Sequence, residues 1–285
     1  WLKKVVQDHA IDAVVSDNRF GLYHKKIPCI FITHQLKVKS PLGKWSERLL
    51  QKRNYRYINR FKECWVPDTP DDDNLAGELS HPGKKPGIPL YYIGPLSRFQ
   101  YSSIPEEKNH LLFLLSGPEP QRTLFENRVV AEIAHYNGTA VIVRGLPGEN
   151  RVIPSTNMIR FYNHLPTDML SNEIGIAEFI ISRSGYSTVM DMSAMKKKCV
   201  FIPTPGQTEQ EYLAEYLEKK QFACFLHQHT FSLAACLEQA AQFKYRIAPP
   251  MGEPILKKVI ERFCNAIRAS APNNLSMEKG ARQQF

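Results

Sequence analysis

The chain has 285 residues, of which 43% are hydrophobic and 23% charged, a composition that excludes a wholly disordered or fibrous protein. Its net charge of +9 is concentrated between Lys37 and Lys62, where nine basic residues face one acid, so the rest is close to neutral. No apolar run approaches the ~18 residues of a membrane-spanning helix, and the residues after Trp1 contain no apolar signal-sequence core.

Short apolar segments alternate with helical patterns along the chain. Strands are predicted at 12–16, 28–33, 63–66, 90–93, 111–115, 139–143, 158–161, 178–182, 199–202 and 222–226. Helices are predicted at 1–9, 44–61, 120–135, 184–195, 208–220 and 230–242. Apolar strands separated by helices are typical of βαβ units, so we expect an α/β protein with parallel sheets covered on both faces.

Residues 67–109 interrupt this alternation with seven prolines and an acidic run. We expect an extended loop followed by an interdomain linker at 94–109. The strands after it are enough for a complete nucleotide-binding domain at 110–253. Residues 1–93 hold too few strands for an independent doubly wound domain.

The sequence therefore predicts two Rossmann-like parallel-sheet domains, of which the first is incomplete in this chain. Because the chain starts at Trp1, we interpret it as a fragment or processed product. A C-terminal helix at 254–268 begins at Pro254, and residues 269–285 are polar and predicted to be a disordered tail.

The six cysteines are scattered and form no C-x-x-C pair. Most lie in apolar runs, where a free thiol packs as a small hydrophobic group. This pattern favours a reducing cytosol over a disulfide framework or a zinc site.

One strand-turn-helix segment is the most informative part of the chain. An apolar strand runs into Ser184-Gly185 and then into a helix, and such a helix start suits a phosphate. Arg183 and the hydroxyls of Ser184 or Thr188 can add contacts, and Asp191, two turns on, can accept hydrogen bonds from ribose hydroxyls. The same residues also fit a plain N-cap with Asp191 in solvent.

A similar turn follows the next strand, where polar residues crowd the start of the helix. These residues are Gln207, Thr208, Glu209 and Gln210. An acid at a helix start is ordinary capping, but two amides beside it would suit sugar hydroxyls.

Other strand ends carry weaker signals. Ser116-Gly117 lies in a small-residue turn that lacks the G-x-G-x-x-G fingerprint, and Arg144 follows the next strand. Asp17-Asn18-Arg19 and His34-Gln35 also follow strands, where an acceptor-binding or catalytic group can stand, although loop polarity explains them almost as well.

The basic segment forms an amphipathic helix on a helical wheel over 45–61. Leu50, Asn54, Tyr57, Ile58 and Phe61 form the expected core face, and the opposite face is basic with two apolar residues inside it. We interpret that face as one that binds a membrane surface. The alternatives are a solvated helix face and a patch that binds nucleic acid. The residues of this basic face are Trp45, Arg48, Leu49, Lys52, Arg53 and Arg56.

Two of these blocks in order resemble the C-terminal donor domain of glycosyltransferase family 28. The first is Ser182-Arg183-Ser184-Gly185…Thr188…Asp191, and the second is Pro203…Glu209-Gln210. The resemblance extends over roughly 175 residues, and the first half of the chain is similar more loosely, up to Ile93-Gly94-Pro95.

The resemblance implies a two-domain glycosyltransferase B-type fold that binds a UDP-sugar between its domains. Asp191 would hold the ribose, Ser184-Gly185 would face the diphosphate, and Leu165 would present its backbone to the base. Glu209 and Gln210 would contact the donor sugar. The resemblance also implies that the protein uses no metal and no cofactor, with the UDP-sugar as a co-substrate.

The chain departs from the family pattern at three points. Asp191 stands where the pattern has glutamate, Glu209 replaces the first glutamine, and Leu213-Ala214 replaces N-A, so the donor sugar stays open. The catalytic histidine of the family lies in a glycine-rich loop that this chain lacks. On this reading the fragment binds donor without turnover, and no catalytic residue is assigned.

The expected function is transfer of an N-acetylhexosamine or hexose from a UDP-sugar to a lipid-linked or cell-envelope acceptor. The expected location is the cytoplasm, peripheral at the inner face of an anionic membrane, with no nucleic-acid partner. The alternatives are a nucleotide-sugar hydrolase or epimerase on the same fold and a non-catalytic nucleotide-sugar-binding protein.

Overall fold

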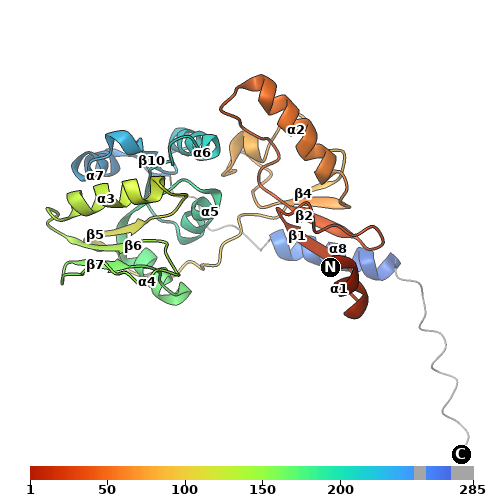
Figure 1. The fold of residues 1–285 in the computed structure, drawn as a ribbon, viewed down its shortest axis with the longest axis horizontal. Coiled ribbons are helices and arrows are strands. Elements are labelled where there is room, and N and C mark those ends of the chain that lie inside the picture. Colours follow the sequence, from red (N-terminus) through yellow and green to blue (C-terminus); the bar gives the residue numbers. More distant parts are fainter. Residues whose placement is uncertain (247–254, 271–285) are drawn as a thin grey trace, which may run out of the picture.

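The computed structural model describes residues 1–246 and 255–270, which form two α/β domains (Figure 1). Every strand pair in the two sheets is parallel. The first domain contains α1 (Leu2–Asp8), β1 (Val14–Asp17), β2 (Cys29–Ile32), α2 (Lys44–Ile58), β3 (Glu63–Val66), the 3-10 turn η1 (Gly77–Leu79) and β4 (Leu90–Tyr92).

The first sheet has the order β1-β2-β3-β4, and its central strands β2 and β3 are buried on both faces. Phe31 and Cys64 point to one face, where they pack with Ile58 of α2. Ile30 and Trp65, one residue away on the same strands, point to the other face. Successive side chains on a strand alternate in this way, which is why both faces need a cover.

The second domain contains a six-stranded sheet with helices on both faces. Its elements are β5 (Glu107–Leu114), α3 (Gln121–Ile133), β6 (Thr139–Val143), β7 (Ile159–Tyr162), α4 (Thr167–Ile176), β8 (Ala177–Ser182), α5 (Tyr186–Met195), β9 (Cys199–Phe201), α6 (Thr208–Lys219), β10 (Cys224–Phe225), the 3-10 turn η2 (Gln228–Thr230) and α7 (Leu233–Gln242). The core on one face includes residues of α4, α5 and α6, and that on the other includes residues of α3 and α7.

The strand order β10-β9-β8-β5-β6-β7 creates a switch point between β5 and β8. From β5 the chain proceeds through β6 to β7 on one side, then returns to place β8 on the other side of β5. At such a point the flanking connections lie on opposite faces of the sheet and leave a crevice beyond the carboxyl ends of the strands. This topology makes the ends of β5 and β8 the expected ligand position.

The last described helix, α8 (Ile255–Ser270), returns to the first domain. Val259 and Phe263 pack with Ile30, Trp65 and Ile93 on the face that α2 leaves open. Arg262 also donates to the buried carboxylate of Glu63 at 2.7 Å. The first domain is therefore closed by the most distant helix of the chain.

The ten predicted strands are confirmed, with shifted ends. The largest shift is in β5, which begins at Glu107, so the end of the segment expected as a linker is strand. The sequence did not predict α4 or the two 3-10 turns. The C-terminal helix continues to Ser270, two residues into the segment expected as tail, while Pro254 and 271–285 lie outside the described residues.

Candidate donor site at the carboxyl edge of the second sheet

Three turns meet at the carboxyl ends of the neighbouring strands β5, β8 and β9. Ser116-Gly117 follows β5, Arg183 to Gly185 follow β8, and 202–207 follow β9. Gly117 has a φ of 109°, in the region that favours glycine, and a Cβ there would lie 3.4 Å from Oγ1 of Thr204. The backbone of the first turn therefore lies close to the third.

The start of α5 is open at Gly185. This residue has an ordinary φ of −68°, and a Cβ placed on it would meet no atom within 4 Å. Neither backbone strain nor packing within the described chain therefore explains glycine at this position. The free N–H groups of the first turn of α5 and its partial positive charge are suited to an anion.

The starts of α5 and α6 are joined by hydrogen bonds. Ser184 is buried, and its hydroxyl donates to the main-chain carbonyl of Gln210 at 2.8 Å. The Gln210 side chain accepts from the Thr204 N–H at 2.9 Å and donates to Oε1 of Gln207 at 2.5 Å. Both glutamine amides predicted to contact a sugar are thus also used to shape the turn, and Thr208 is half-buried beside them.

Asp191 lies two turns into α5, as its spacing predicts, and contacts the segment between the domains. One oxygen, Oδ1, accepts from the Ser97 hydroxyl at 2.7 Å. Burial raises the pKa of Asp191 above its ordinary value of 3.8, and the Ser97 hydrogen bond opposes that shift in part. Thr188 is half-buried on the same helix.

His34 of the first domain reaches this site, a contact that the sequence did not assign. Its Nε2 lies 2.9 Å from Oε1 of Glu209, and its ring stacks on Tyr186 at 4.2 Å between centroids. Tyr186 in turn donates from its hydroxyl to the Pro67 carbonyl at 2.8 Å. The predicted sugar-contacting carboxylate is therefore held by a histidine that lies 175 residues away in sequence.

The structure corrects the predicted contact between Arg183 and a phosphate. The Arg183 guanidinium is buried and already donates hydrogen bonds within the protein. It donates to the carbonyls of Ile202 at 2.9 Å and Gln121 at 3.0 Å, and to Oε1 of Gln228 at 2.7 Å. It also lies 4.7 Å over the Phe125 ring. Burial lowers the pKa of Arg183 to about 10, and we assign this side chain to holding the turns together.

Arg144 is likewise buried in an internal network and is not free to bind a donor. Its guanidinium pairs with Glu126 and donates to Oδ1 of Asn163 at 2.6 Å and the Arg151 carbonyl at 2.8 Å. Glu126 also accepts from Arg122, and the two arginines hold its pKa below the ordinary value against the effect of burial. The Leu165 side chain is buried in the core, in the turn before α4.

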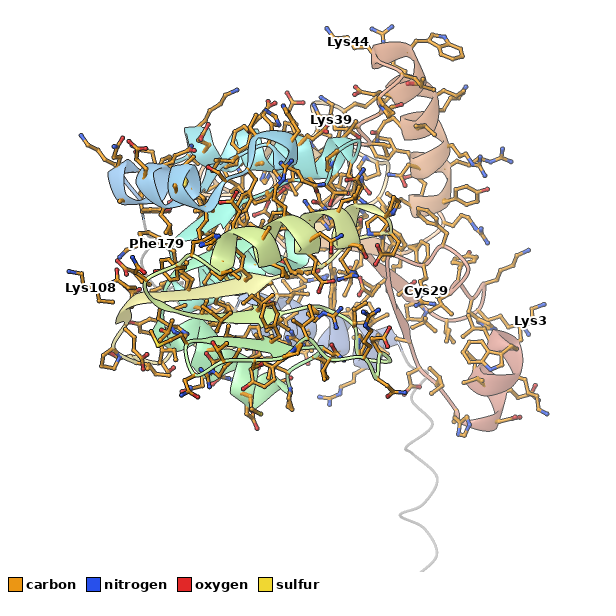
Figure 2. The ribbon with its side chains drawn as sticks, turned by 60° about the vertical axis from the view of Figure 1, so that its left-hand side comes forward. Lys3, Cys29, Lys39, Lys44, Lys108 and Phe179 are labelled. Atoms are coloured by element: carbon orange, nitrogen blue, oxygen red, sulfur yellow. The ribbon has the colours of Figure 1, made fainter. Side chains whose placement is uncertain are left out.

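The outer face of α2 carries the predicted membrane residues, with one change at its core face. Trp45 is 77% exposed and Leu49 is 58% exposed, and the basic residues Arg48, Lys52, Arg53 and Arg56 are exposed with them. Leu50, expected in the core, is exposed as well, and Tyr55 is buried in its place. Figure 2 shows Lys44 at the end of α2 that projects from the body of the molecule.

Two further kinds of feature are absent from the described ranges. Over 1–246 and 255–270, no three His, Cys, Asp or Glu side chains are grouped so that they could hold a metal ion. Within the same ranges, no helix has the length and hydropathy needed to cross a bilayer.

Part of the chain matches a known family of protein domains. Residues 157–262 match the glycosyltransferase family 28 C-terminal domain. The second domain is therefore similar to the donor domains of that family. The match includes α5, α6 and the turns before them, so the resemblance stated from the sequence motifs is confirmed.

Two curated proteins are similar to the same part of the chain. Over 145 residues the chain is 27% identical to the UDP-N-acetylglucosamine--N-acetylmuramyl-(pentapeptide) pyrophosphoryl-undecaprenol N-acetylglucosamine transferase of Buchnera aphidicola subsp. Schizaphis graminum. The alignment covers 48% of this chain and 39% of the relative. The chain thus spans about two fifths of the length of the curated relatives it matches.

Solved structures that resemble both domains confirm the glycosyltransferase B-type fold. The UDP-GlcNAc 2-epimerase from Neisseria meningitidis bound to UDP-GlcNAc has a TM-score of 0.58 and 11% identity, over 93% of this chain and 79% of that one. The glycosyltransferase SnogD from Streptomyces nogalater has a TM-score of 0.57 and 11% identity, over 92% and 74%. At this identity the likeness concerns the fold, which transferases and epimerases share.

Proposed function

We propose that this chain binds a UDP-sugar and belongs to an enzyme that transfers its sugar, a hexose or N-acetylhexosamine, to a lipid-linked or cell-envelope acceptor. The observation that carries the proposal is the open start of α5 at the β5–β8 switch point, with Gly185 unconstrained by packing. The family 28 match and the curated relatives, whose names include a UDP-sugar donor and a pyrophosphoryl-undecaprenol acceptor, support the transferase rather than the epimerase reading.

In the proposed donor complex the start of α5 faces the diphosphate. Its backbone N–H groups and the helix dipole would stabilise the negative charge that grows on UDP as the bond to the sugar breaks. The Asp191 carboxylate would accept from the ribose hydroxyls, and Leu165 would present its backbone to the base. This arrangement supplies the electrostatic part of the reaction from the second domain.

The donor sugar would lie where the first domain meets α6. Glu209 points to this position, and His34 fixes its carboxylate through the 2.9 Å contact. We assign His34 as a positioning residue for Glu209, because a carboxylate that is held in one place can distinguish the hydroxyls of different sugars. The exposed basic and apolar face of α2 would bring the enzyme to an anionic membrane that carries the acceptor.

The test is calorimetric binding of UDP, UDP-N-acetylglucosamine, UDP-glucose, GDP, dTDP and CMP to the chain. We expect the uridine diphosphates to bind and Asp191→Ala to weaken them at least tenfold, which is the effect of about 1.4 kcal/mol of lost hydrogen bonding. Glu215→Ala, an exposed acid on α6, is the matched control and should bind as the parent does. Equal binding by parent and Asp191→Ala would remove Asp191 from the site, and no binding by the parent would refute the proposal.

A second measurement separates the transferase from a nucleotide-sugar hydrolase. A hydrolase would release free sugar from its UDP-sugar in water, whereas a transferase needs the lipid-linked acceptor. Release of free sugar at the same rate with and without acceptor would favour the hydrolase.

A further inference from the structure

The connection that follows β3 in the first domain packs into the second domain. We call its residues 67–80 the docking segment. Leu75, Ala76 and Leu79 are buried in the same hydrophobic core as residues of α5 and α6, although the chain returns to the first sheet at β4. The docking segment therefore attaches the two domains to each other by its own packing, in addition to the covalent connection after β4.

A buried carboxylate shapes the docking segment. Asp68 is fully buried, and its oxygens accept from the N–H groups of Thr69, Leu75 and Ala76 at 2.8 to 3.0 Å. The Ser80 hydroxyl donates to the same carboxylate at 2.6 Å. These charge-assisted hydrogen bonds join the two ends of the segment, so it presents one conformation to the second domain.

Two tyrosines of α6 hold the docking segment. The Tyr212 hydroxyl accepts from the Glu78 N–H at 2.7 Å, and the Tyr216 hydroxyl donates to Oδ1 of Asn74 at 2.7 Å. Gly77 has a φ of 53°, and a Cβ on it would clash with the Tyr212 hydroxyl and lie 2.9 Å from the Tyr216 ring. The backbone at Gly77 therefore approaches α6 more closely than a residue with a side chain would allow.

The tyrosines share a face of α6 with the proposed sugar-contacting carboxylate. Glu209, Tyr212 and Tyr216 are three and four residues apart, a spacing that places them on one side of a helix. Glu209 contacts His34, and both tyrosines contact the docking segment. All three contacts of this face with the first domain therefore depend on one relative placement of the two domains.

The docking segment is also bonded to the chain around His34. The Lys37 N–H donates to the Leu79 carbonyl at 2.9 Å. On the other side, the His34 ring stacks on Tyr186, whose hydroxyl donates to the carbonyl of Pro67. The segment thus contacts the residues that carry His34 and the helix that carries Glu209 at the same time.

We propose that the docking segment fixes the first domain against α6 and so forms the sugar position before the donor binds. Tyr212 and Tyr216 are then positioning residues for the contact between His34 and Glu209. This inference rests on the proposed function, which places the donor sugar at Glu209. A protein whose domains had to close around the donor would lose affinity in proportion to its open population, and a preformed site avoids that loss.

The test compares Gly77→Ala with Gly43→Ala in calorimetric binding of UDP, UDP-N-acetylglucosamine and UDP-glucose. Both glycines have a positive φ, but a Cβ at Gly43 would meet no atom of the described chain within 4 Å. We expect Gly77→Ala to bind the UDP-sugar that the parent prefers about tenfold more weakly, because the sugar position is displaced. Its affinity for UDP should stay within about twofold of the parent, since the nucleotide contacts belong to the second domain. Gly43→Ala should bind every ligand as the parent does.

A second variant keeps the packing and removes only the polar contacts. Tyr212→Phe/Tyr216→Phe retains both rings, and we expect it to lose about threefold in affinity for the UDP-sugar with UDP binding unchanged. Tyr101→Phe, at a tyrosine that is 54% exposed, is the matched control and should change neither affinity. Equal losses of UDP and UDP-sugar affinity in both docking variants would overturn the inference, because they would indicate general damage to the second domain.

Small-angle X-ray scattering tests the fixed placement of the domains directly. The radius of gyration of the parent should be the same with and without the UDP-sugar, and ligand-free Gly77→Ala should be more extended than ligand-free Gly43→Ala. Contraction of the parent on donor binding would overturn the inference, and so would equal scattering by the two ligand-free variants. Failure of the parent to bind UDP would instead refute the proposed function, and the ligand-free comparison would still decide the role of the docking segment.

Discussion

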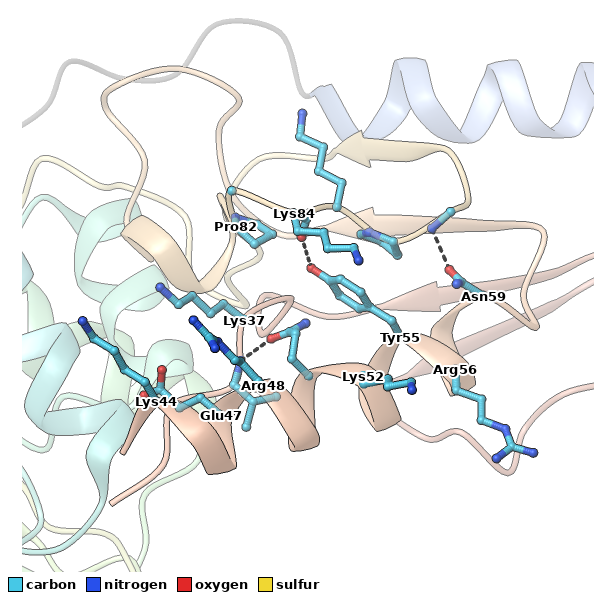
Figure 3. A pocket seen from close by; sticks show the side chains of 16 residues that line it. Lys37, Lys44, Glu47, Arg48, Lys52, Tyr55, Arg56, Asn59, Pro82 and Lys84 are labelled. Atoms are coloured by element: carbon cyan, nitrogen blue, oxygen red, sulfur yellow. Dashed lines mark hydrogen bonds between the residues drawn. The ribbon is translucent and has the colours of Figure 1, made fainter. Parts of the chain in front are cut away.

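The two domains use their cations in opposite ways. In the second domain Arg183 and Arg144 are buried, and their N–H groups donate hydrogen bonds to carbonyls, an amide and a carboxylate of the same domain. In the first domain a groove between α2 and residues 82–87 is lined by seven cations, of which six are exposed (Figure 3). Within the described ranges, none of these six lies at ion-pair distance from an acid. Buried cations can be kept only when every donor is satisfied, whereas exposed ones are free for a ligand. The number of cations in a domain therefore does not indicate whether its side chains are available to bind an anion.

The sharpest test of this difference is the stability of Arg183→Met. Removing the guanidinium takes away the donor to the buried Ile202 carbonyl and to Oε1 of the buried Gln228. We therefore expect the free energy of unfolding to fall by about 3 kcal/mol. Urea denaturation measures it. Lys84→Gln/Lys85→Gln in the exposed groove should change stability by less than about 0.5 kcal/mol. Similar losses in both variants would erase the contrast between the domains.

A pair of glycines sharpens the comparison at the level of the backbone. Gly185 and Gly83 both have open space where a Cβ would be. We expect Gly185→Val to reduce UDP affinity at least tenfold without loss of thermal stability, because the side chain would occupy the phosphate position at the start of α5. Gly83→Val should leave UDP affinity unchanged. A Gly185→Val protein that binds UDP as the parent does would contradict the assigned donor site.

The contact between His34 and Glu209 joins the two domains and can be measured by a double-mutant cycle. We expect His34→Ala and Glu209→Gln each to weaken UDP-sugar binding, and the double variant to be little worse than either single one. A coupling of about 1 kcal/mol is expected for a partly exposed pair. Additive losses in calorimetry would mean that His34 does not act through Glu209.

The smallest expected effect is a shift in pH dependence at Asp191. Its pKa is raised by burial, so the carboxylate proposed to accept from ribose is protonated at a higher pH than an ordinary aspartate with a pKa of 3.8. UDP affinity should therefore fall as the pH is lowered through that raised pKa. Ser97→Ala removes a hydrogen bond that lowers the pKa, so the fall should begin at a higher pH. Binding curves of the two proteins that superimpose across the acidic range would contradict the contact.

The parts of the fold that follow from local pattern were predictable. Apolar runs such as Leu111 to Leu115 and Phe179 to Ser182 are buried on both faces, and this composition alone predicts strands of a parallel sheet. The sequence did not predict helix α4, because only two of its buried residues, Leu170 and Ile174, are apolar side chains that mark a helix face. Gly175, the residue before its last, lies close to the Ile104 side chain, a contact that no local pattern contains.

The orientation of α2 shows a second limit. A wheel assigns faces by hydrophobicity, but this helix is docked by polar side chains that bond to neighbouring loops. Tyr55 is therefore buried and Leu50 is left in solvent. In the same way the contact of His34 with Glu209 depends on the packing of two domains, and the burial of Arg183 depends on three turns meeting.

The return of α8 to the first domain has a consequence for synthesis on the ribosome. The second domain is contained within 107–242, so it can fold while the C-terminal residues are still in the exit tunnel. The first domain cannot cover Ile30 and Trp65 until Phe263 has emerged, because α8 supplies that face of its core. Within this chain the usual order of domain folding is thus reversed, because the first domain is made before the second but is enclosed after it.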